Sequence, residues 1–290
     1  TSLLSFNNDG FTVGTDYHLN QSSSYDYVAW CWRAGGSKNT FNVDDVGYAS
    51  AAAAGLDGGT INPTGASVGT KQGFSILKYT GSGSNGTIAH GLSQAPDFFF
   101  GRDLEDSGGS RDWIIYHKSI GNTGRLKFTT GSTSTSSTFF QDTSPTNSLI
   151  TVGTSNDINS TNDYILYCWH NVAGLQKFGK YEGNNNNDGV FVELGFRPSI
   201  LLIKRIDNTD DWFWYDGTRR PINVNSRYLR PNSTAVENTG DGAGTGLDLL
   251  SNGFKIRSDS SAINAAETYI YAAWAEAPTV DLYGGGANAR

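Results

Sequence analysis

The sequence predicts an all-β protein built from tandem antiparallel β-sandwich repeats of jelly-roll or lectin-like style. Composition is the first reason, because Gly, Ser, Thr and Asn supply about 41% of the 290 residues, whereas charged residues supply only 17%. The second reason is a series of strand-length apolar segments, rich in aromatic and β-branched residues, that alternate with polar loops. The third reason is internal similarity at a spacing of about a hundred residues.

The internal similarity is clearest in one apolar segment that occurs three times. Residues 26–32 (DYVAWCW) resemble residues 163–169 (DYILYCW) and residues 268–274 (TYIYAAW). Other landmarks recur at a similar spacing, with Tyr79, Pro96 and Trp113 matching Tyr181, Pro198 and Trp212. We therefore expect two complete β-sandwich units, at residues 73–173 and 174–278.

Three further parts of the chain lie outside these units. Residues 1–35 match the C-terminal strands of an incomplete unit, and we expect them to pair with a missing N-terminal part or with another chain. Residues 36–72 contain AAAAGLDGG and no apolar periodicity, which is typical of a linker or an excursion. Residues 279–290 are expected to form a C-terminal tail. The chain has no Met, which indicates that it is processed or part of something longer.

Within a unit, the order of strands and turns can be followed along the chain. The strands expected in the first unit are residues 73–81, 97–100, 112–117, 148–153 and 163–170. Asn-Gly and Asp-Gly steps mark tight turns at residues 9–10, 85–86, 188–189 and 252–253. Only AAAAG and INAAE are weakly helical in character.

The closing strands of the incomplete unit and of the first complete unit each carry one cysteine. In residues 27–32 alternate side chains point to opposite faces, and both faces are largely apolar, which suits a central strand. Cys31 and Cys168 are the only cysteines and hold matching positions, so we expect both thiols to be buried and reduced. Matching positions in separate sandwiches lie too far apart for the Cα separation of roughly 4.4–6.8 Å that a disulfide needs.

Charge and hydropathy exclude two classes of partner. The net charge of -7 and the pI near 5.0 argue against nucleic acid. No run of about eighteen apolar residues occurs, so membrane insertion is not expected. The N-terminal stretch TSLLSFNNDG lacks the basic and apolar regions of a signal peptide.

The order of the motifs resembles a known family. GFSI-x-x-YTG, HGL-x-x-AP-D, DW-x-x-YH, SNGF and YIYAAWAEAP follow one another as in a repeated domain of tail-fibre-like and other virion structural proteins of phages, especially marine and cyanobacterial phages. The resemblance covers essentially the whole chain apart from residues 36–72. It implies localisation in the virion, in a tail fibre or another surface appendage, and it supplies no catalytic residue.

Titratable residues form no pattern that predicts a metal site or a cofactor. The histidines lack HExxH, HxH or CxxC spacing, and His90 is expected to cap a loop; the four are His18, His90, His117 and His170. Carboxylates cluster in one loop of each unit, namely Asp103, Glu105, Asp106 and Asp112, and then Asp207, Asp210 and Asp211.

These carboxylate clusters have three possible readings. Paired carboxylates serve glycoside hydrolysis in many enzymes, and carboxylate groups also hold calcium. The spacing differs between the two units, which favours the third reading, a solvated hairpin tip with Asp as turn former. We expect no enzymatic activity.

Aromatic residues provide the one candidate binding site. Trp214 is particular to the second unit and precedes several polar side chains. An exposed Trp beside hydrogen-bonding groups is a common way to hold a sugar. The candidate glycan site consists of Trp214, Asp216, Arg219, Arg220, Asn223, Arg227 and Tyr228. In the alternative, Trp214 packs against the neighbouring unit or another subunit.

The favoured function is a structural and adhesive component of a phage virion, a tail-fibre segment that contacts host-surface glycan. A capsid or appendage decoration protein with only protein partners is the alternative, and a polysaccharide depolymerase is a second one. Strands that are apolar on both faces need cover from the next unit or from another chain. We therefore expect a homo-oligomer, a trimer, with other virion proteins and a host glycan or receptor as further partners.

Overall fold

The structure is a computed structural model, and it describes residues 2–7, 10–21, 25–106, 108–109, 111–239 and 243–276. The all-β prediction is confirmed, because strands account for 38% of the chain and helices for 4%. The helical segments are single turns: α1 (Ser137–Phe140), η1 (Ala243–Thr245) and α2 (Ser261–Asn264). Among the described residues, none of these helices is long and apolar enough to cross a membrane.

The chain divides into two compact units, residues 1–32 and 33–290. In the first, β1 (Leu3–Phe6) and β2 (Phe11–Val13) form an antiparallel hairpin. The strand expected at residues 26–32 does not form, and Cys31 is exposed, so the prediction of burial was wrong for this thiol. The matching residues 163–169 have a hydrogen-bonded strand on each side, and the described part of residues 1–32 offers residues 26–32 no such pair.

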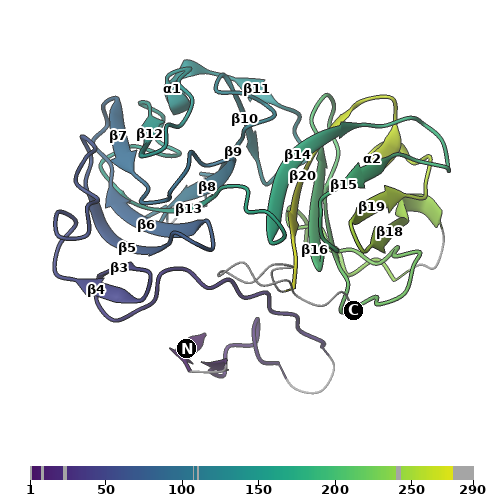
Figure 1. Ribbon diagram of the computed structural model, residues 1–290, viewed down its shortest axis with the longest axis horizontal. Helices are drawn as coiled ribbons and strands as arrows, with labels where there is room; N and C mark the ends of the chain where they lie inside the picture. Colours follow the sequence, from purple (N-terminus) through teal and green to yellow (C-terminus); the bar gives the residue numbers. More distant parts are fainter. Residues whose placement is uncertain are drawn as a thin grey trace. The chain divides into compact units, whose positions relative to one another are not determined.

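The first β-sandwich of the larger unit has a nine-stranded sheet, in the order β11-β10-β9-β8-β13-β6-β5-β3-β4, and a two-stranded sheet of β7 and β12 (Figure 1). Its strands are β3 (Phe41–Val43), β4 (Val46–Tyr48), β5 (Pro63–Gly69), β6 (Phe74–Thr80), β7 (Gly86–Ala89), β8 (Phe98–Asp103), β9 (Ile114–His117), β10 (Gly124–Lys127), β11 (Ser134–Thr135), β12 (Leu149–Val152) and β13 (Asp163–Trp169). One buried cluster joins the sheets, with Ile88 and Ile150 from the small sheet and Leu77 and Leu166 from the large one.

The segment 36–72 is part of this sandwich, so its interpretation as a linker was wrong. It supplies β3, β4 and β5, and β5 pairs antiparallel with β6 while β3 pairs parallel with β5. Ala66 and Val68 alternate into the core. The sequence PTGASVG has mostly small side chains, so a period-2 apolar pattern is hard to recognise in it.

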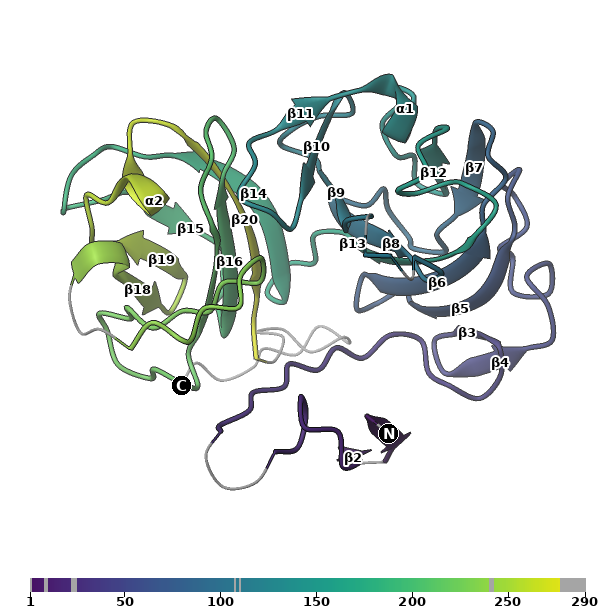
Figure 2. The same ribbon diagram turned by 180° about the vertical axis from the view of Figure 1, so that it is seen from behind.

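The second β-sandwich has a four-stranded sheet, β14-β20-β16-β17, and a three-stranded sheet, β15-β19-β18 (Figure 2). Its strands are β14 (Gln176–Glu182), β15 (Phe191–Glu193), β16 (Ile200–Arg205), β17 (Trp212–Asp216), β18 (Leu247–Leu250), β19 (Gly253–Ile256) and β20 (Thr268–Trp274). A second buried cluster joins these sheets, with Leu201 and Tyr269 on one and Leu249 and Phe254 on the other.

Equivalent strand pairings and side-chain contacts occur within each of the two sandwiches. β13 lies between β6 and β8, and β20 lies between β14 and β16. The Tyr79 hydroxyl donates to the Ile158 carbonyl at 2.6 Å, and the Tyr181 hydroxyl donates to the Ile263 carbonyl at 2.7 Å. These shared contacts agree with the alignment of the two units, while a repeat origin stays an interpretation of the sequence.

The outer faces of the two larger sheets pack against each other through aromatic side chains. Ring centroids are 5.4 Å apart for Phe98 and Phe178 and 6.0 Å apart for Trp169 and Trp274. The Trp212 indole N–H donates to the Lys127 carbonyl at 3.0 Å. We call this interface the aromatic seam; it consists of Phe98, Phe128, Trp169, Phe178, Trp212 and Trp274. The next unit of the same chain thus supplies cover for strands that are apolar on both faces.

Candidate functional site

Trp214 lies in β17 and is half-buried. Its ring stacks on Trp274, with centroids 6.2 Å apart and planes 23° apart. Its backbone N–H and carbonyl both pair with Leu229, at 2.9 and 3.0 Å. The indole is therefore partly engaged in packing within its own sandwich, and this stacking is not against the neighbouring unit, while part of its surface remains accessible.

Asp216 and Arg219 bind each other. The Asp216 carboxylate is 3% exposed and forms an ion pair with the Arg219 guanidinium, and it accepts the Arg219 backbone N–H at 2.7 Å. Arg219 also forms an ion pair with Glu237, a residue that the sequence analysis missed. Glu237 lies 18 positions further along an irregular loop, and no local pattern could have found it.

The other members of the candidate set mostly support the loop that follows β17. The Asn223 side chain accepts the Leu249 N–H at 3.0 Å and donates to the Leu249 carbonyl at 3.3 Å. Tyr228 is buried, and its ring meets Phe213 edge-on at 5.0 Å. Arg220 and Arg227 are half-buried.

The structure therefore brings Trp214, Asp216 and Arg219 together. It uses Asn223 and Tyr228 to hold the loop in place. Assignment of the whole set to a glycan stays a prediction.

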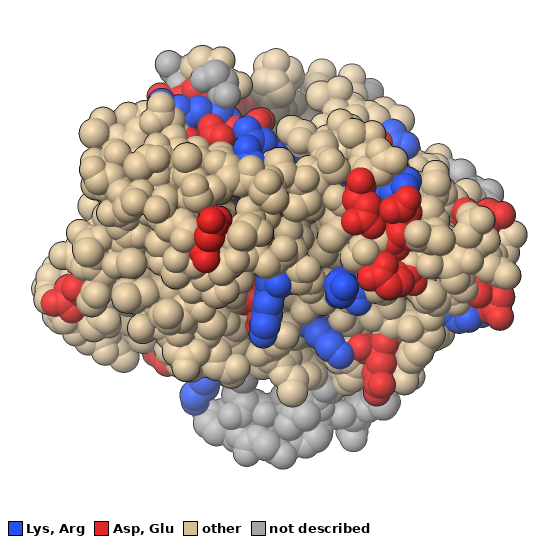
Figure 3. All heavy atoms as spheres, turned by 90° about the horizontal axis from the view of Figure 1, so that it is seen from above, with Lys and Arg blue, Asp and Glu red and all other residues tan. Residues whose placement is uncertain are grey.

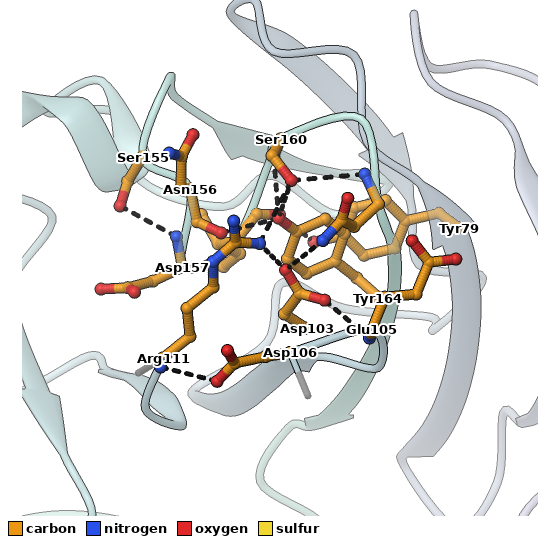
Figure 4. Close-up of polar contacts among 12 residues, drawn as sticks. Tyr79, Asp103, Glu105, Asp106, Arg111, Ser155, Asn156, Asp157, Ser160 and Tyr164 are labelled. Carbon is orange, nitrogen blue, oxygen red and sulfur yellow. Dashed lines mark hydrogen bonds and ion pairs between the residues drawn. The ribbon is translucent and has the colours of Figure 1, made fainter. Parts of the chain in front are cut away.

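The first carboxylate loop is organised by an ion pair rather than by solvent (Figure 4). The Asp103 carboxylate, at the end of β8, is buried and pairs with the Arg111 guanidinium. The Asn162 amide donates to it at 2.9 Å and the Glu105 N–H at 2.8 Å. The prediction of a solvated turn former was wrong about solvent, because Asp103 is buried and paired with Arg111, and right about the turn, because Asp103 accepts the N–H of Glu105 two residues on.

This ion pair is connected to the core through Tyr164. The Tyr164 hydroxyl accepts the Ser160 N–H at 2.8 Å and donates to the Asn156 carbonyl at 2.7 Å (Figure 4). Arg111 lies 3.4 Å from the Ser160 hydroxyl oxygen. The Tyr164 ring stacks on Tyr79 with centroids 5.3 Å apart, and burial raises the pKa of the Tyr79 hydroxyl well above its usual value. The network holds the loop in place.

Other carboxylates of the two clusters are also held by the fold. Asp112 lies 3.1 Å from the Lys127 ammonium group, and Asp211 lies 3.1 Å from the Arg230 guanidinium. Asp207 accepts the Thr268 N–H at 2.6 Å. Across the described residues, no group of three or more His, Cys, Asp or Glu side chains is placed to hold a metal ion.

Three of the four histidines are buried, and two of these, His90 and His117, have a lowered pKa that leaves them uncharged near neutral pH. His90 accepts the Leu92 N–H at 3.1 Å and lies 3.1 Å from the Thr146 carbonyl, which confirms that it caps a loop. His117 lies 3.1 Å from the Tyr271 carbonyl across the aromatic seam. Burial lowers the pKa of each imidazole to about 4.

Lys204 is a buried cation that the sequence analysis missed. Its ammonium group donates to the Arg205 carbonyl at 2.7 Å and to the Thr130 carbonyl at 3.4 Å. Burial lowers the pKa of Lys204 to about 8, against the attraction of Asp210 and Asp211. Its contact with Thr130 links the two sandwiches beside the aromatic seam. The sequence signal that could have identified this buried cation is a Lys at an apolar strand position, in LLIKR.

Comparisons with known proteins identify the family of the chain. They do not identify a relative with a known activity. A family model described as a domain of unknown function (DUF7483) matches residues 1–278. No curated protein and no solved structure matches the chain significantly.

Proposed function

We propose that this chain, which belongs to the DUF7483 family of domains of unknown function, is a structural and adhesive component of a phage virion. The proposal is argued from the residues of the chain, because the family has no described function. In this proposal it forms part of a tail fibre and contacts host-surface glycan. The order of the sequence motifs, from GFSI-x-x-YTG to YIYAAWAEAP, resembles that in phage virion structural proteins. This resemblance supports a location in the virion.

The aromatic seam is the observation that carries the structural half of the proposal. It joins two sandwiches through close ring contacts, and the His117 and Trp212 side chains bond to backbone carbonyls across it. Packing of this kind fixes the orientation of neighbouring domains. A fibre that transmits force from a surface to a particle needs such stiff junctions.

The pairing of carboxylates with cations also supports a structural role. Asp103 is paired with Arg111 and Asp112 with Lys127, whereas a depolymerase needs a proton-exchanging carboxylate pair in an open cleft. On the face in Figure 3, Lys and Arg are interspersed with Asp and Glu among mostly uncharged residues. A face of mixed sign does not attract ligands of one charge over long range.

Electron microscopy of labelled particles tests the location. Antibodies against the purified chain are applied to particles of the phage that encodes it, with a phage lacking the gene as control. Gold at the tail fibre supports the proposal. Gold on the capsid favours a decoration protein, and absence of the chain from purified particles rejects a virion role.

Glycan binding by the purified chain tests the adhesive half. A glycan array is probed with the parent protein, with Trp214→Ala and with Phe191→Ala, which removes another exposed aromatic ring from the second sandwich. The proposed site predicts that Trp214→Ala weakens binding and Phe191→Ala does not. Because Trp214 also stacks on Trp274, Trp214→Ala is expected to lower the melting temperature, and binding is compared at a temperature at which all three proteins are folded. Equal binding by all three proteins rejects Trp214 as a sugar contact.

A further inference from the structure

A groove of about 290 Å³ lies in the first sandwich, in a region that the candidate residues do not include. Three chain segments line it, and the lining residues are Gly55, Gly58, Ala89, Gly91, Leu92, Asn147, Ser148 and Leu149. The volume is at the lower end of the range for small-molecule sites.

One wall of the groove belongs to residues 50–59, which we call the strap. Leu56 anchors the strap in the core at 1% exposure, and its N–H donates to the Ala51 carbonyl at 2.8 Å. At Gly59 an added Cβ would lie 2.4 Å from the Thr87 carbonyl oxygen, so the strap passes directly over β7. These contacts hold the wall in place before any ligand arrives, which lowers the entropic cost of binding.

The floor and the opposite wall are equally fixed. Gly91 has a φ of +72°, and an added Cβ there would lie 2.8 Å from the Leu56 side chain. The His90 N–H donates to the Ser148 carbonyl at 3.2 Å, and the Asn147 side-chain oxygen accepts the Ala95 N–H at 3.2 Å. Within the described part of the chain, the Asn147 NH₂ group has no acceptor, and the Ser148 hydroxyl has a 3.5 Å contact with the Thr146 hydroxyl, so both can bond to a ligand.

The lining selects an uncharged ligand. None of the eight lining residues is ionisable, so the lining offers a charged group no counter-charge. Leu149 is half-buried and offers apolar surface, whereas Ala89 and Leu92 are buried beneath the groove. The exposed side chains of Asn147 and Ser148 offer hydrogen bonds. A sugar ring has the matching combination of a C–H face and a hydroxyl rim.

A peptide strand fits this region less well. β7 pairs along its length with β12, and on its other side Ile61 donates to the Thr87 carbonyl at 2.9 Å. Recognition of an extended peptide by strand addition needs a free edge, and β7 has strand or bridge partners on both sides.

From these observations we propose that the groove beneath the strap binds an uncharged saccharide. The inference rests on the proposed adhesive function and gives it a site distinct from Trp214. It also gives residues 36–72 a role, because the strap belongs to that segment and supplies one wall of the groove.

Gly58 offers a direct test. Gly58 lines the groove, no heavy atom of the described residues lies within 4 Å of a Cβ added there, and its φ is not in the left-handed region, so Gly58→Phe adds a ring at the groove without straining the strap. Gly244 in the second sandwich meets the same two conditions, and Gly244→Phe is the matched control. The full chain and both variants are titrated by ligand-observed NMR with methyl glycosides of glucose, galactose, mannose and N-acetylglucosamine, and with glucuronic acid.

The expected result is that at least one neutral glycoside binds the parent protein, that Gly58→Phe weakens this binding at least tenfold, and that Gly244→Phe leaves it unchanged. Ser148→Ala is expected to weaken it several-fold. No binding of any neutral glycoside, preference for glucuronic acid, or unchanged binding by Gly58→Phe each overturns the proposal.

Two further outcomes separate the groove from the proposed function. Glycan binding that depends on Trp214 and not on Gly58 overturns the groove and leaves the adhesive function in place. Binding that depends on Gly58, in a protein that antibodies do not find on the particle, supports the groove and rejects the virion role.

Discussion

His117 shows how a single uncharged side chain connects two sandwiches. Its ring lies 3.1 Å from the Tyr271 carbonyl, and its second nitrogen accepts the Ser119 N–H at 3.2 Å. Because a carbonyl can only accept, the ring nitrogen facing Tyr271 carries the proton, and the other nitrogen must stay deprotonated to accept. Protonation of the ring would break the contact with Ser119.

Stability is therefore expected to fall with acid. The pKa of His117 is about 4 in the folded protein and near 6.5 when unfolded, so the unfolded chain binds more protons between these values. The stability contribution is complete above pH 6.5 and is lost as the pH falls to 4, by about 3 kcal/mol. Urea unfolding at pH 7.5 and 4.5 measures it.

The controls for this prediction are two histidine variants. His117→Gln keeps a donor towards Tyr271 and is expected to flatten the pH dependence, although His90 still contributes to it. His18 is exposed, so His18→Gln is expected to change nothing. An unchanged slope in His117→Gln would contradict the assignment.

Arg111 is expected to stabilise the loop between β8 and β9. Arg111→Ala leaves the buried Asp103 carboxylate without its cation, which costs about 3 kcal/mol in unfolding free energy. Arg33→Ala removes an exposed ion pair with Asp45, and no measurable change is expected. Chemical denaturation of the two variants compares a buried pair with an exposed one. Equal effects would refute the account of Asp103 as a buried charge.

At the scale of elements, strands with large apolar residues were predictable and strands with small ones were not. β6, β8, β13 and β20 are long, aromatic or β-branched segments, and the sequence located them. The sequence PTGASVG in β5 escaped detection, because its period-2 signal rests on small residues.

The reverse error occurred at residues 26–32. This segment has the pattern of a strand, but strand formation depends on neighbours with which to pair, and the pattern does not report them. Local periodicity also fails to identify residues that loops bring together. Glu237, which pairs with Arg219 in the candidate glycan site, lies in such a loop, and loops line the groove of the first sandwich.

Val68 tests whether β5 is part of the core. Its side chain is fully buried in the first cluster, and Val68→Ala is expected to lower the unfolding free energy by about 2 kcal/mol. Val46 in β4 is 51% exposed, so Val46→Ala is the matched control with a much smaller effect. Thermal denaturation of both variants is sufficient, and equal midpoints would mean that β5 adds little to the core.

For the whole molecule, residues 1–32 carry the strongest signal for association. Among the described residues of this unit, nine large apolar side chains are at least 39% exposed: Leu3, Leu4, Phe6, Phe11, Tyr17, Leu19, Tyr25, Tyr27 and Val28. Exposed apolar surface of this extent favours contact with another chain. The aromatic seam is covered within the chain, so it no longer argues for an oligomer.

We therefore expect the full chain to associate and residues 33–290 to be monomeric with an unchanged melting temperature. Light scattering of both proteins at micromolar concentration gives their masses. A mass near 31.2 kDa for the full chain would contradict the predicted trimer. Loss of folding in the shorter chain would show that the larger unit depends on residues 1–32.

The aromatic seam also couples the two halves of the larger unit energetically. If one sandwich unfolded alone, Trp169 or Trp274 would lose its ring contact across the seam and expose that face to water, which raises the free energy of every half-folded state. Heating residues 33–290 in a calorimeter should therefore give one peak whose van't Hoff and calorimetric enthalpies agree. Trp169→Ala should split that peak in two, because each sandwich keeps its own buried cluster and can then melt at its own temperature.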